Sequence, residues 1–226
     1  MLVLFDIDGT LISSGRAGMR GMNRSFERLF GVSGALDQVS LAGRTDRAIV
    51  TEALTRSGFP ADDETILRVR DAYLEDLSSA LAGGAASSGA GVLPGVSALL
   101  DELAAEGVVT GLLTGNFAGG AAIKLGHYRL WDRFAFGAFG DHHADRRHLV
   151  EIAVAAAAEA GHGRFEPRRV VVIGDTPLDV DCAHAYGARA IAVATGPYSH
   201  ETLAETGPAV TVQTLAEVTV GLIVNL

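Results

Sequence analysis

The stretch LVLFDIDGT, residues 2–10, directs the interpretation of the whole chain. Four apolar residues run directly into Asp6 and Asp8. A continuous apolar run is typical of a strand that is buried on both faces of a parallel sheet. Side chains alternate along a strand, so both carboxylates are predicted to lie on one side, about 6–7 Å apart, at the carboxyl end of the strand. Open parallel sheets bind their ligands at that end.

Short apolar runs of the same kind recur along the chain, and helical patterns follow them. They span residues 108–114, 134–139, 169–175 and 189–195, with 209–213 as a sixth candidate. Strands that alternate with helices predict βαβ units. We therefore expect an α/β fold with a Rossmann-like parallel sheet covered by helices.

Residues 16–88 break this rhythm, because they contain no convincing strand. Three helical patterns are expected there, at 17–31, 45–58 and 62–81. In the first, Met19, Met22 and Phe26 share one face, which we interpret as core of this helical unit rather than as a binding surface. The segment 83–91 is a flexible linker by composition, and 12–18 resembles the matching joint. We predict a core domain made of 1–15 and 89–226, with a helical cap domain at 16–88 inserted after the first strand.

Composition excludes several classes of function. The 226 residues carry a net charge of -9 with scattered basic residues, so a nucleic-acid partner is not expected. Cys182 is the single cysteine, which rules out an internal disulfide and favours a reducing compartment. We expect no signal peptide, and the apolar stretch VTVGLIVNL is too short to span a bilayer. A cytoplasmic location without a membrane partner is expected, and the oligomeric state stays open.

A second pair of carboxylates follows a later apolar run, in VVVIGDTPLDVD. Asp175 comes directly after the run, and Asp179 lies in the first turn of the next helix. If the two strands are neighbours, Asp6, Asp8, Asp175 and Asp179 converge on one small volume. Four unpaired anions would repel one another strongly, so a bound cation is expected. Mg²⁺ suits the site, because it uses few carboxylates together with water and phosphate oxygens.

The run at 108–114 ends in LLTGN, which predicts an anion site at the same edge of the sheet. Thr114 offers a hydroxyl, and Gly115 and Asn116 offer backbone amides near the start of a helix. Charge balance on a phosphoryl group also requires a cation. The segment HHADRRHLVEI supplies Arg146 and Arg147 for that purpose.

The motifs DIDGT, LLTGN and GDTPLD, in this order and spacing, resemble motifs one, two and four of the haloacid dehalogenase-like hydrolase superfamily. The helical segment between motifs one and two resembles the C1 cap of that superfamily. The resemblance covers essentially the whole chain. Within the superfamily, the chain is most similar to the phosphoglycolate phosphatase-like group.

The resemblance implies a role for each matching residue. Asp6 would be the nucleophile that forms an aspartyl-phosphate, and Asp8 would be the general acid and then the general base. The Asp6 carboxylate, the Asp8 main-chain carbonyl and Asp175 would hold Mg²⁺, and Asp179 would support that shell. Thr114 would bind phosphoryl oxygens. A covalent intermediate, a metal and a proton donor together suit the hydrolysis of phosphate monoesters, which is very slow without a catalyst.

Motif three of the family usually carries a lysine, and this chain departs from that pattern. The matching segment DRRHL has no lysine, so we assign the cation to Arg146, with Arg147 as the rival. Lys124 is a further candidate, although its place midway along a helix favours the surface. In the expected cap, Arg44 of the stretch GRTD is either a contact for a second anionic group or part of a solvated capping turn.

These observations predict a Mg²⁺-dependent phosphatase that acts on a small phosphorylated metabolite. The cap is expected to close over the site and select the leaving group. Two alternatives stay open: a sugar-phosphate mutase similar to β-phosphoglucomutase, and a non-catalytic phosphate-binding protein on the same fold. Asp8 argues against a dehalogenase, and the absence of lysine from 16–88 argues against a phosphonate-cleaving enzyme.

Overall fold

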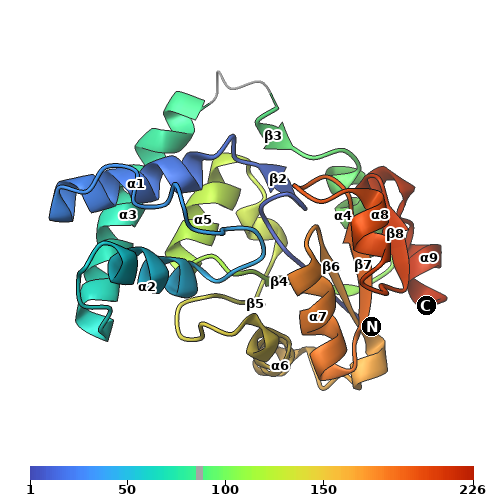
Figure 1. Cartoon of the computed structure of the whole chain (residues 1–226). Helices are drawn as coiled ribbons and strands as arrows, with labels where there is room; N and C mark the ends of the chain where they lie inside the picture. Colours follow the sequence, from blue (N-terminus) through green and yellow to red (C-terminus); the bar gives the residue numbers. More distant parts are fainter. Residues whose placement is uncertain (85–88) are drawn as a thin grey trace.

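A six-stranded, all-parallel sheet forms the centre of the protein (Figure 1). The structure is a computed structural model that describes residues 1–84 and 89–226. The strands follow the order β5-β4-β1-β6-β7-β8 across the sheet. Their bounds are β1 Leu2–Phe5, β4 Val109–Leu113, β5 Gly137–Ala138, β6 Val170–Gly174, β7 Arg189–Val193 and β8 Val210–Val212. The predicted α/β fold is confirmed.

The central position of β1 determines where the predicted motifs meet. Phe5 pairs with Leu112 of β4 on one side and with Ile173 of β6 on the other. The carboxyl ends of β1, β4 and β6 therefore lie at one edge of the sheet. The residues that directly follow these strands are Asp6, Thr114 and Asp175. The prediction that the strand before Asp6 and the strand before Asp175 are neighbours is confirmed, because β1 and β6 are adjacent in the sheet.

Helices cover both faces of the sheet and bury its apolar side chains. Alternation along β1 sends Val3 and Phe5 to one face and Leu2 and Leu4 to the other. The first face packs against α4 (Val96–Ala105), α5 (Ala118–His127) and α9 (Val220–Val224). The second packs against α6 (Leu149–Ala157), α7 (Pro177–Tyr186) and α8 (His200–Ala204).

One predicted strand is much shorter than expected. Of the run at 134–139, only Gly137–Ala138 forms a strand. Phe134 instead turns into the core, where its ring lies 6.1 Å from that of Phe5. Because β5 is an edge strand that pairs with β4 alone, the chain at Phe134 gains more from this packing than from a further ladder bond. The sixth candidate strand is confirmed as β8.

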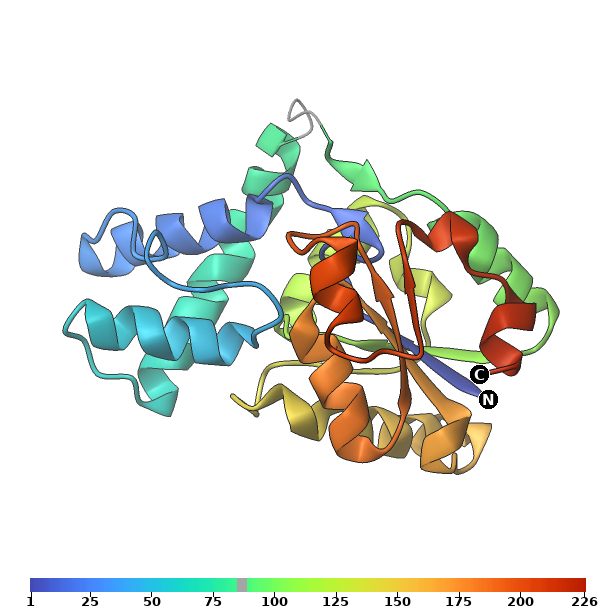
Figure 2. The same ribbon diagram turned by 45° about the vertical axis from the view of Figure 1, so that its right-hand side comes forward.

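The first three helices after β1 form a unit to one side of the sheet (Figure 2). They are α1 (Ala17–Phe30), α2 (Asp46–Arg56) and α3 (Asp63–Gly84), close to the predicted ranges. Met22 and Phe26 are buried in an apolar cluster with residues of α2 and α3. We call α1–α3 and the segments between them the cap. The division of the chain into two domains at 15/16 and 88/89 stays a prediction.

The two connections between the cap and the sheet are tied to each other. Ile12–Ser13 (β2) pairs antiparallel with Gly91–Val92 (β3). The predicted joint at 12–18 is thus partly a strand rather than a loop. Residues 85–88 of the predicted linker lie outside the described residues. Within the described ranges, the structure has no helix that combines the length and the apolar character needed to cross a bilayer.

Candidate active site

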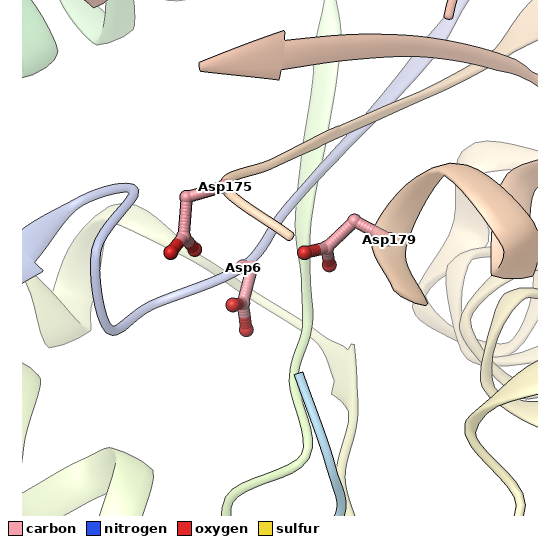
Figure 3. Close-up of side chains that lie close together, drawn as sticks. All are labelled: Asp6, Asp175 and Asp179. Carbon is pink, nitrogen blue, oxygen red and sulfur yellow. The ribbon is translucent and has the colours of Figure 1, made fainter. Parts of the chain in front are cut away.

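Three of the four predicted carboxylates meet at the carboxyl edge of the sheet. Asp6, Asp175 and Asp179 each place an oxygen within 4.8 Å of the others, and all three residues are buried (Figure 3). Asp6 follows β1, Asp175 follows β6, and Asp179 lies in the first turn of α7. The sheet and a single helix start therefore hold the cluster.

Local sequence features orient two of these carboxylates. Asp179 closes a capping box at the start of α7, because its Oδ2 accepts hydrogen bonds from the Thr176 amide at 3.0 Å and hydroxyl at 2.7 Å. Asp175 accepts a hydrogen bond of 3.1 Å from the Thr10 hydroxyl. A Cβ on Gly196 would lie 1.7 Å from Asp175 Oδ2, so only glycine leaves room for the carboxylate there.

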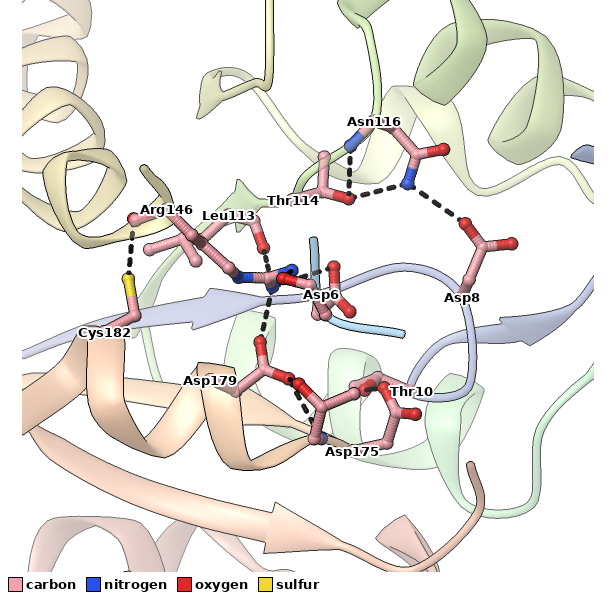
Figure 4. A network of polar contacts seen from close by, with 12 residues as sticks. Asp6, Asp8, Thr10, Leu113, Thr114, Asn116, Arg146, Asp175, Asp179 and Cys182 are labelled. Atoms are coloured by element: carbon pink, nitrogen blue, oxygen red, sulfur yellow. Dashed lines mark hydrogen bonds and ion pairs between the residues drawn. The ribbon is translucent and has the colours of Figure 1, made fainter. Parts of the chain in front are cut away.

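Arg146 is the cation that the structure brings to this cluster. Its Nη2 lies 3.2 Å from Asp6 Oδ1 and also donates to Asp179 Oδ1 (Figure 4). Its Nε is buried without a hydrogen-bond partner among the described residues. Arg147, the rival candidate, is exposed and pairs with Asp181 at 2.7 Å.

The cluster holds more carboxylates than cationic side chains. Burial raises the pKa of Asp6 to about 6, Arg146 opposes that shift, and Asp179 adds to it. Burial and the negative charge of Asp6 raise the pKa of Asp175 well above its usual range. Three carboxylates face one guanidinium, which leaves two negative charges when all groups are ionised. A hard divalent cation with oxygen ligands would balance them, so the donor set fits Mg²⁺. Both oxygens of Asp179 are already engaged, by Thr176 and by Arg146.

Asp8 does not join the other three carboxylates, so the expected convergence of all four side chains is wrong. The chain turns after Ile7 instead of continuing as a strand, since the Thr10 and Leu11 amides both donate to the Ile7 carbonyl. The strand alternation assumed for Asp6 and Asp8 therefore does not apply beyond Ile7. The Asp8 carboxylate lies apart from the cluster in Figure 4.

Lys124 is the partner of Asp8, and the expected surface position of this lysine is wrong. Lys124 is 4% exposed, and its Nζ lies 2.6 Å from Asp8 Oδ2 and 2.5 Å from Asn116 Oδ1. Burial alone would raise the pKa of Asp8, but the Lys124 ammonium and hydrogen bonds from Asn116 and Ser14 outweigh it and lower that pKa. The end of the Lys124 side chain lies close to Gly18 of the cap, where an added Cβ would be 3.3 Å from Nζ.

The LLTGN motif connects the two groups of carboxylates. Thr114 is fully buried beside the cluster, and its Oγ1 accepts hydrogen bonds from the amide and the side chain of Asn116. The same Asn116 side chain donates to Asp8 Oδ2 at 3.0 Å. The backbone amide of Asn116, expected to face an anion, is thus turned to Thr114. Gly115 lies against the Arg44 carbonyl, which a Cβ there would approach to 2.1 Å.

The cap touches the site through residues 43–46. The Gly43 carbonyl accepts from Arg146, Thr45 donates to the Ala144 carbonyl, and Asp46 accepts from the Phe117 amide at 2.8 Å. The Arg44 guanidinium turns back onto the cap itself, where it pairs with Glu52 at 2.6 Å. The structure therefore gives Arg44 a carboxylate partner, and its role with a second anionic group stays a prediction.

A cavity of about 490 Å³ lies between the cap and the sheet edge. Its wall on the sheet side includes Asp6, Asp8, Thr114 and Arg146. Its wall on the cap side includes Met19 and Met22 from the predicted core stripe, so these methionines line the cavity as well as pack within the cap. A small molecule in this cavity would lie between these two walls.

Two contacts of the site, Lys124 with Asp8 and Asp46 with Phe117, were not predicted from the sequence. Lys124 is the only lysine of the chain, and it follows Ala121 by one helical turn and precedes Leu125, both of which are buried. Its place on the apolar face of α5 was a readable signal that it points inward. Asp46 was visible only as part of a capping turn, and no pattern linked it to Phe117.

The comparisons with known proteins agree with this geometry. The family model described as haloacid dehalogenase-like hydrolase matches residues 3–193. A phosphoglycolate phosphatase of Rhodospirillum rubrum is 28% identical over 210 residues, which cover 91% of this chain and 83% of that protein. The chain therefore belongs to the haloacid dehalogenase-like hydrolases, in their phosphoglycolate phosphatase-like group.

The chain is also similar to a protein kinase in sequence and to a solved structure in fold. The tyrosine-protein kinase PtkA of Mycobacterium tuberculosis is 30% identical over 196 residues, which cover 86% of this chain and 62% of the kinase. The structure of CbbY from Rhodobacter sphaeroides in complex with phosphate superposes with a TM-score of 0.76 at 21% identity, covering 100% of this chain and 99% of that one. The second similarity shows a common fold.

Proposed function

We propose that this protein is a Mg²⁺-dependent phosphatase that hydrolyses a small phosphomonoester through an aspartyl-phosphate on Asp6. The observation that carries the proposal is the buried cluster of Asp6, Asp175 and Asp179 with Arg146 at the edge of the sheet. The relationship to a phosphoglycolate phosphatase supports the same reaction class.

In the first step, a carboxylate oxygen of Asp6 attacks phosphorus while the bond from phosphorus to the leaving oxygen breaks. Asp6 has a fixed position, because the backbone amide of Asp6 donates to the Ile173 carbonyl and its side chain pairs with Arg146. Arg146 keeps an unused buried donor, Nε, for a phosphoryl oxygen. The Thr114 hydroxyl and the Gly115 amide complete the proposed phosphate site, and Asn116 supports it through Thr114.

Asp8 supplies the proton that the leaving oxygen takes up. Lys124 and Asn116 hold its carboxylate in one orientation. An arriving dianionic phosphoryl group would raise the pKa of Asp8 and favour the protonated form needed in this step. After the leaving alcohol departs, the Asp8 carboxylate accepts a proton from water, which attacks the aspartyl-phosphate and releases inorganic phosphate.

Asp6 and Asp175 would hold Mg²⁺, together with the main-chain carbonyl of Asp8. Asp179 would support these ligands through the hydrogen bonds that it accepts from Arg146 and Thr176. When bound, the metal offsets negative charge on the phosphoryl oxygens. A bound cation would stabilise these buried carboxylates in two ways. The cation would relieve their mutual repulsion, and it would replace the hydration that they lose on burial.

The test is release of inorganic phosphate from p-nitrophenyl phosphate, with and without Mg²⁺. We expect turnover that a chelator abolishes and that Asp6→Asn lowers by at least a thousandfold. Asp101→Asn is the matched control, because Asp101 is exposed and pairs with Arg133 away from the cavity. Turnover that survives in Asp6→Asn would overturn the assignment of the nucleophile.

Product analysis separates the two alternatives. A sugar-phosphate mutase would transfer the phosphoryl group to a second hydroxyl of a sugar phosphate and release little inorganic phosphate. A non-catalytic binding protein would bind phosphate without turnover of any ester. We expect release of inorganic phosphate in proportion to the alcohol formed.

A further inference from the structure

The cap side of the cavity is mostly apolar. Its larger aliphatic and thioether side chains come from α1, from the segment between α1 and α2, and from α2, and Tyr73 of α3 lines the cavity as well. The aliphatic and thioether side chains are Met19, Met22, Leu36, Leu41 and Ile49. Three of them, Met22, Leu36 and Ile49, are at most 5% exposed and also belong to the apolar cluster of the cap. The leaving group of a substrate would rest against this wall, because the phosphoryl site occupies the opposite one.

The cations that line the cavity are mostly engaged already. Lys124 pairs with Asp8, Arg146 with Asp6 and Asp179, and Arg44 with Glu52. Arg44 also donates to the Ser40 and Ala48 carbonyls, which holds its guanidinium against the cap. A second anionic group on the substrate would have to break one of these pairs to gain Lys124, Arg146 or Arg44 as a partner.

Arg16 is the one cation of the described lining for which the structure shows no carboxylate partner. Its side chain is exposed and contacts the Met19 sulfur at 3.1 Å. An exposed guanidinium in water gives an anion little net binding energy. Asp46 also lines the cavity and adds a carboxylate that would repel a second anion.

We propose that the preferred substrates are phosphate monoesters of uncharged, largely apolar alcohols. Esters that carry a second anionic group, such as phosphoglycolate or a sugar bisphosphate, would be poor substrates. This inference rests on the proposed phosphatase function and narrows it to a substrate class. Transfer of one methylene from water to an apolar wall is worth about fourfold in kcat/KM if it is fully realised. Burial of an unpaired carboxylate opposes binding much more strongly than a methylene favours it.

The experiment compares phosphoglycolate with isobutyl phosphate, whose leaving group has the same number of non-hydrogen atoms. We expect kcat/KM for isobutyl phosphate to be at least tenfold higher. We also expect kcat/KM to rise by up to about fourfold for each methylene from ethyl to butyl phosphate. The glycolate oxygen is intrinsically the better leaving group, so the chemistry of the bond broken cannot produce this preference. A preference for phosphoglycolate in the unmodified protein would overturn the inference.

Two variants test the wall directly. Met19→Lys adds a cation at a half-buried position of the lining, and we expect it to lower the ratio of isobutyl phosphate to phosphoglycolate by at least tenfold. Arg16→Gln should leave that ratio unchanged within about twofold. A tenfold rise of the ratio in Arg16→Gln would show that Arg16 binds a second anion and would overturn the inference. The comparison in the unmodified protein does not depend on either variant folding.

The outcomes also separate this inference from the proposed function. If p-nitrophenyl phosphate and all alkyl phosphates remain intact with Mg²⁺, the phosphatase function fails and the inference fails with it. If p-nitrophenyl phosphate is hydrolysed but the anionic esters are preferred, the function stands and only the inference fails.

Discussion

Replacement of Lys124 by methionine removes the ammonium that holds Asp8 while keeping a side chain of similar length and an apolar stem. Loss of one partner of a fully buried ion pair costs about 3–5 kcal/mol of unfolding free energy. The Asp8 side chain is 39% exposed, however, and it keeps hydrogen bonds from Asn116 and Ser14. We therefore expect a loss of about 2 kcal/mol, which lowers Tm by about 4–8 °C in a chain of this length.

The effect of Lys124→Met on activity should depend on the leaving group. Asp8 without this ammonium is oriented toward the leaving oxygen only by the hydrogen bonds from Asn116 and Ser14. A well-positioned proton donor contributes about 10²–10⁴-fold to the rate, and part of that contribution is lost. We expect kcat/KM for an alkyl phosphate to fall by about a hundredfold. The value for p-nitrophenyl phosphate, whose phenolate needs little protonation, should fall by less than about tenfold.

The assay measures both esters at saturating Mg²⁺ and follows thermal unfolding by circular dichroism. Arg133→Met is the matched control, because it also removes the cation of an ion pair, but on the surface with Asp101. Such pairs are worth about 0–1 kcal/mol, and neither ester should be affected. An equal loss of kcat/KM on the two esters in Lys124→Met would refute the reasoning, since it would show that Lys124 does not act through Asp8.

Three further predictions concern the carboxylates. Mg²⁺ at a hundredfold excess over Kd should raise the unfolding free energy by about 2.7 kcal/mol. At a fixed Mg²⁺ concentration this stabilisation should be larger at pH 7.5 than at pH 5, because Asp6 (pKa about 6) and Asp175 must ionise to bind the ion. Asp175→Asn should abolish this shift in Tm, and an unchanged shift would place the ion elsewhere. Gly196→Ala should also weaken Mg²⁺ binding, measured by calorimetry, because the added methyl displaces the Asp175 carboxylate; an unaltered Kd would contradict this. Burial raises the pKa of Asp46 from 3.8 to about 6, so the folded state holds its proton more tightly and loses stability as the pH rises through that range. The Tm of Asp46→Asn relative to the unmodified protein should thus be higher at pH 7.5 than at pH 4.5, and a difference independent of pH would count against the shift.

Much of the fold could be predicted because buried parallel strands leave continuous apolar runs. The runs ahead of Asp6, Thr114 and Asp175 each became a strand of the sheet, and their adjacency brought the motifs together. The failure at Phe134 has a different origin. Its burial against Phe5 depends on a residue more than a hundred positions away, which no local pattern encodes.

The site could be predicted in its residue types but not in all of its pairings. The convergence of Asp6, Asp175 and Asp179 follows from topology, and so does the presence of a hydroxyl at Thr114. The ion pair between Asp8 and Lys124 does not follow from topology, because the turn after Ile7 redirects the Asp8 side chain. Lys124 reaches Asp8 from α5, beneath a cap whose position is set by tertiary packing.

The strand that carries the proposed nucleophile lies in the middle of the sheet, between partners that come much later in the chain. The nearer neighbour, β4, begins more than a hundred residues after β1, and the other, β6, more than a hundred and sixty. During synthesis, β1 therefore has no partner until about half of the polypeptide has emerged, and its second edge stays unpaired until β6 has been made. Contacts of such long range make folding slow, and an exposed apolar strand edge is prone to aggregation. Catalytic competence should appear only late in folding, and chaperones that shield the nascent first strand should raise the yield of active protein.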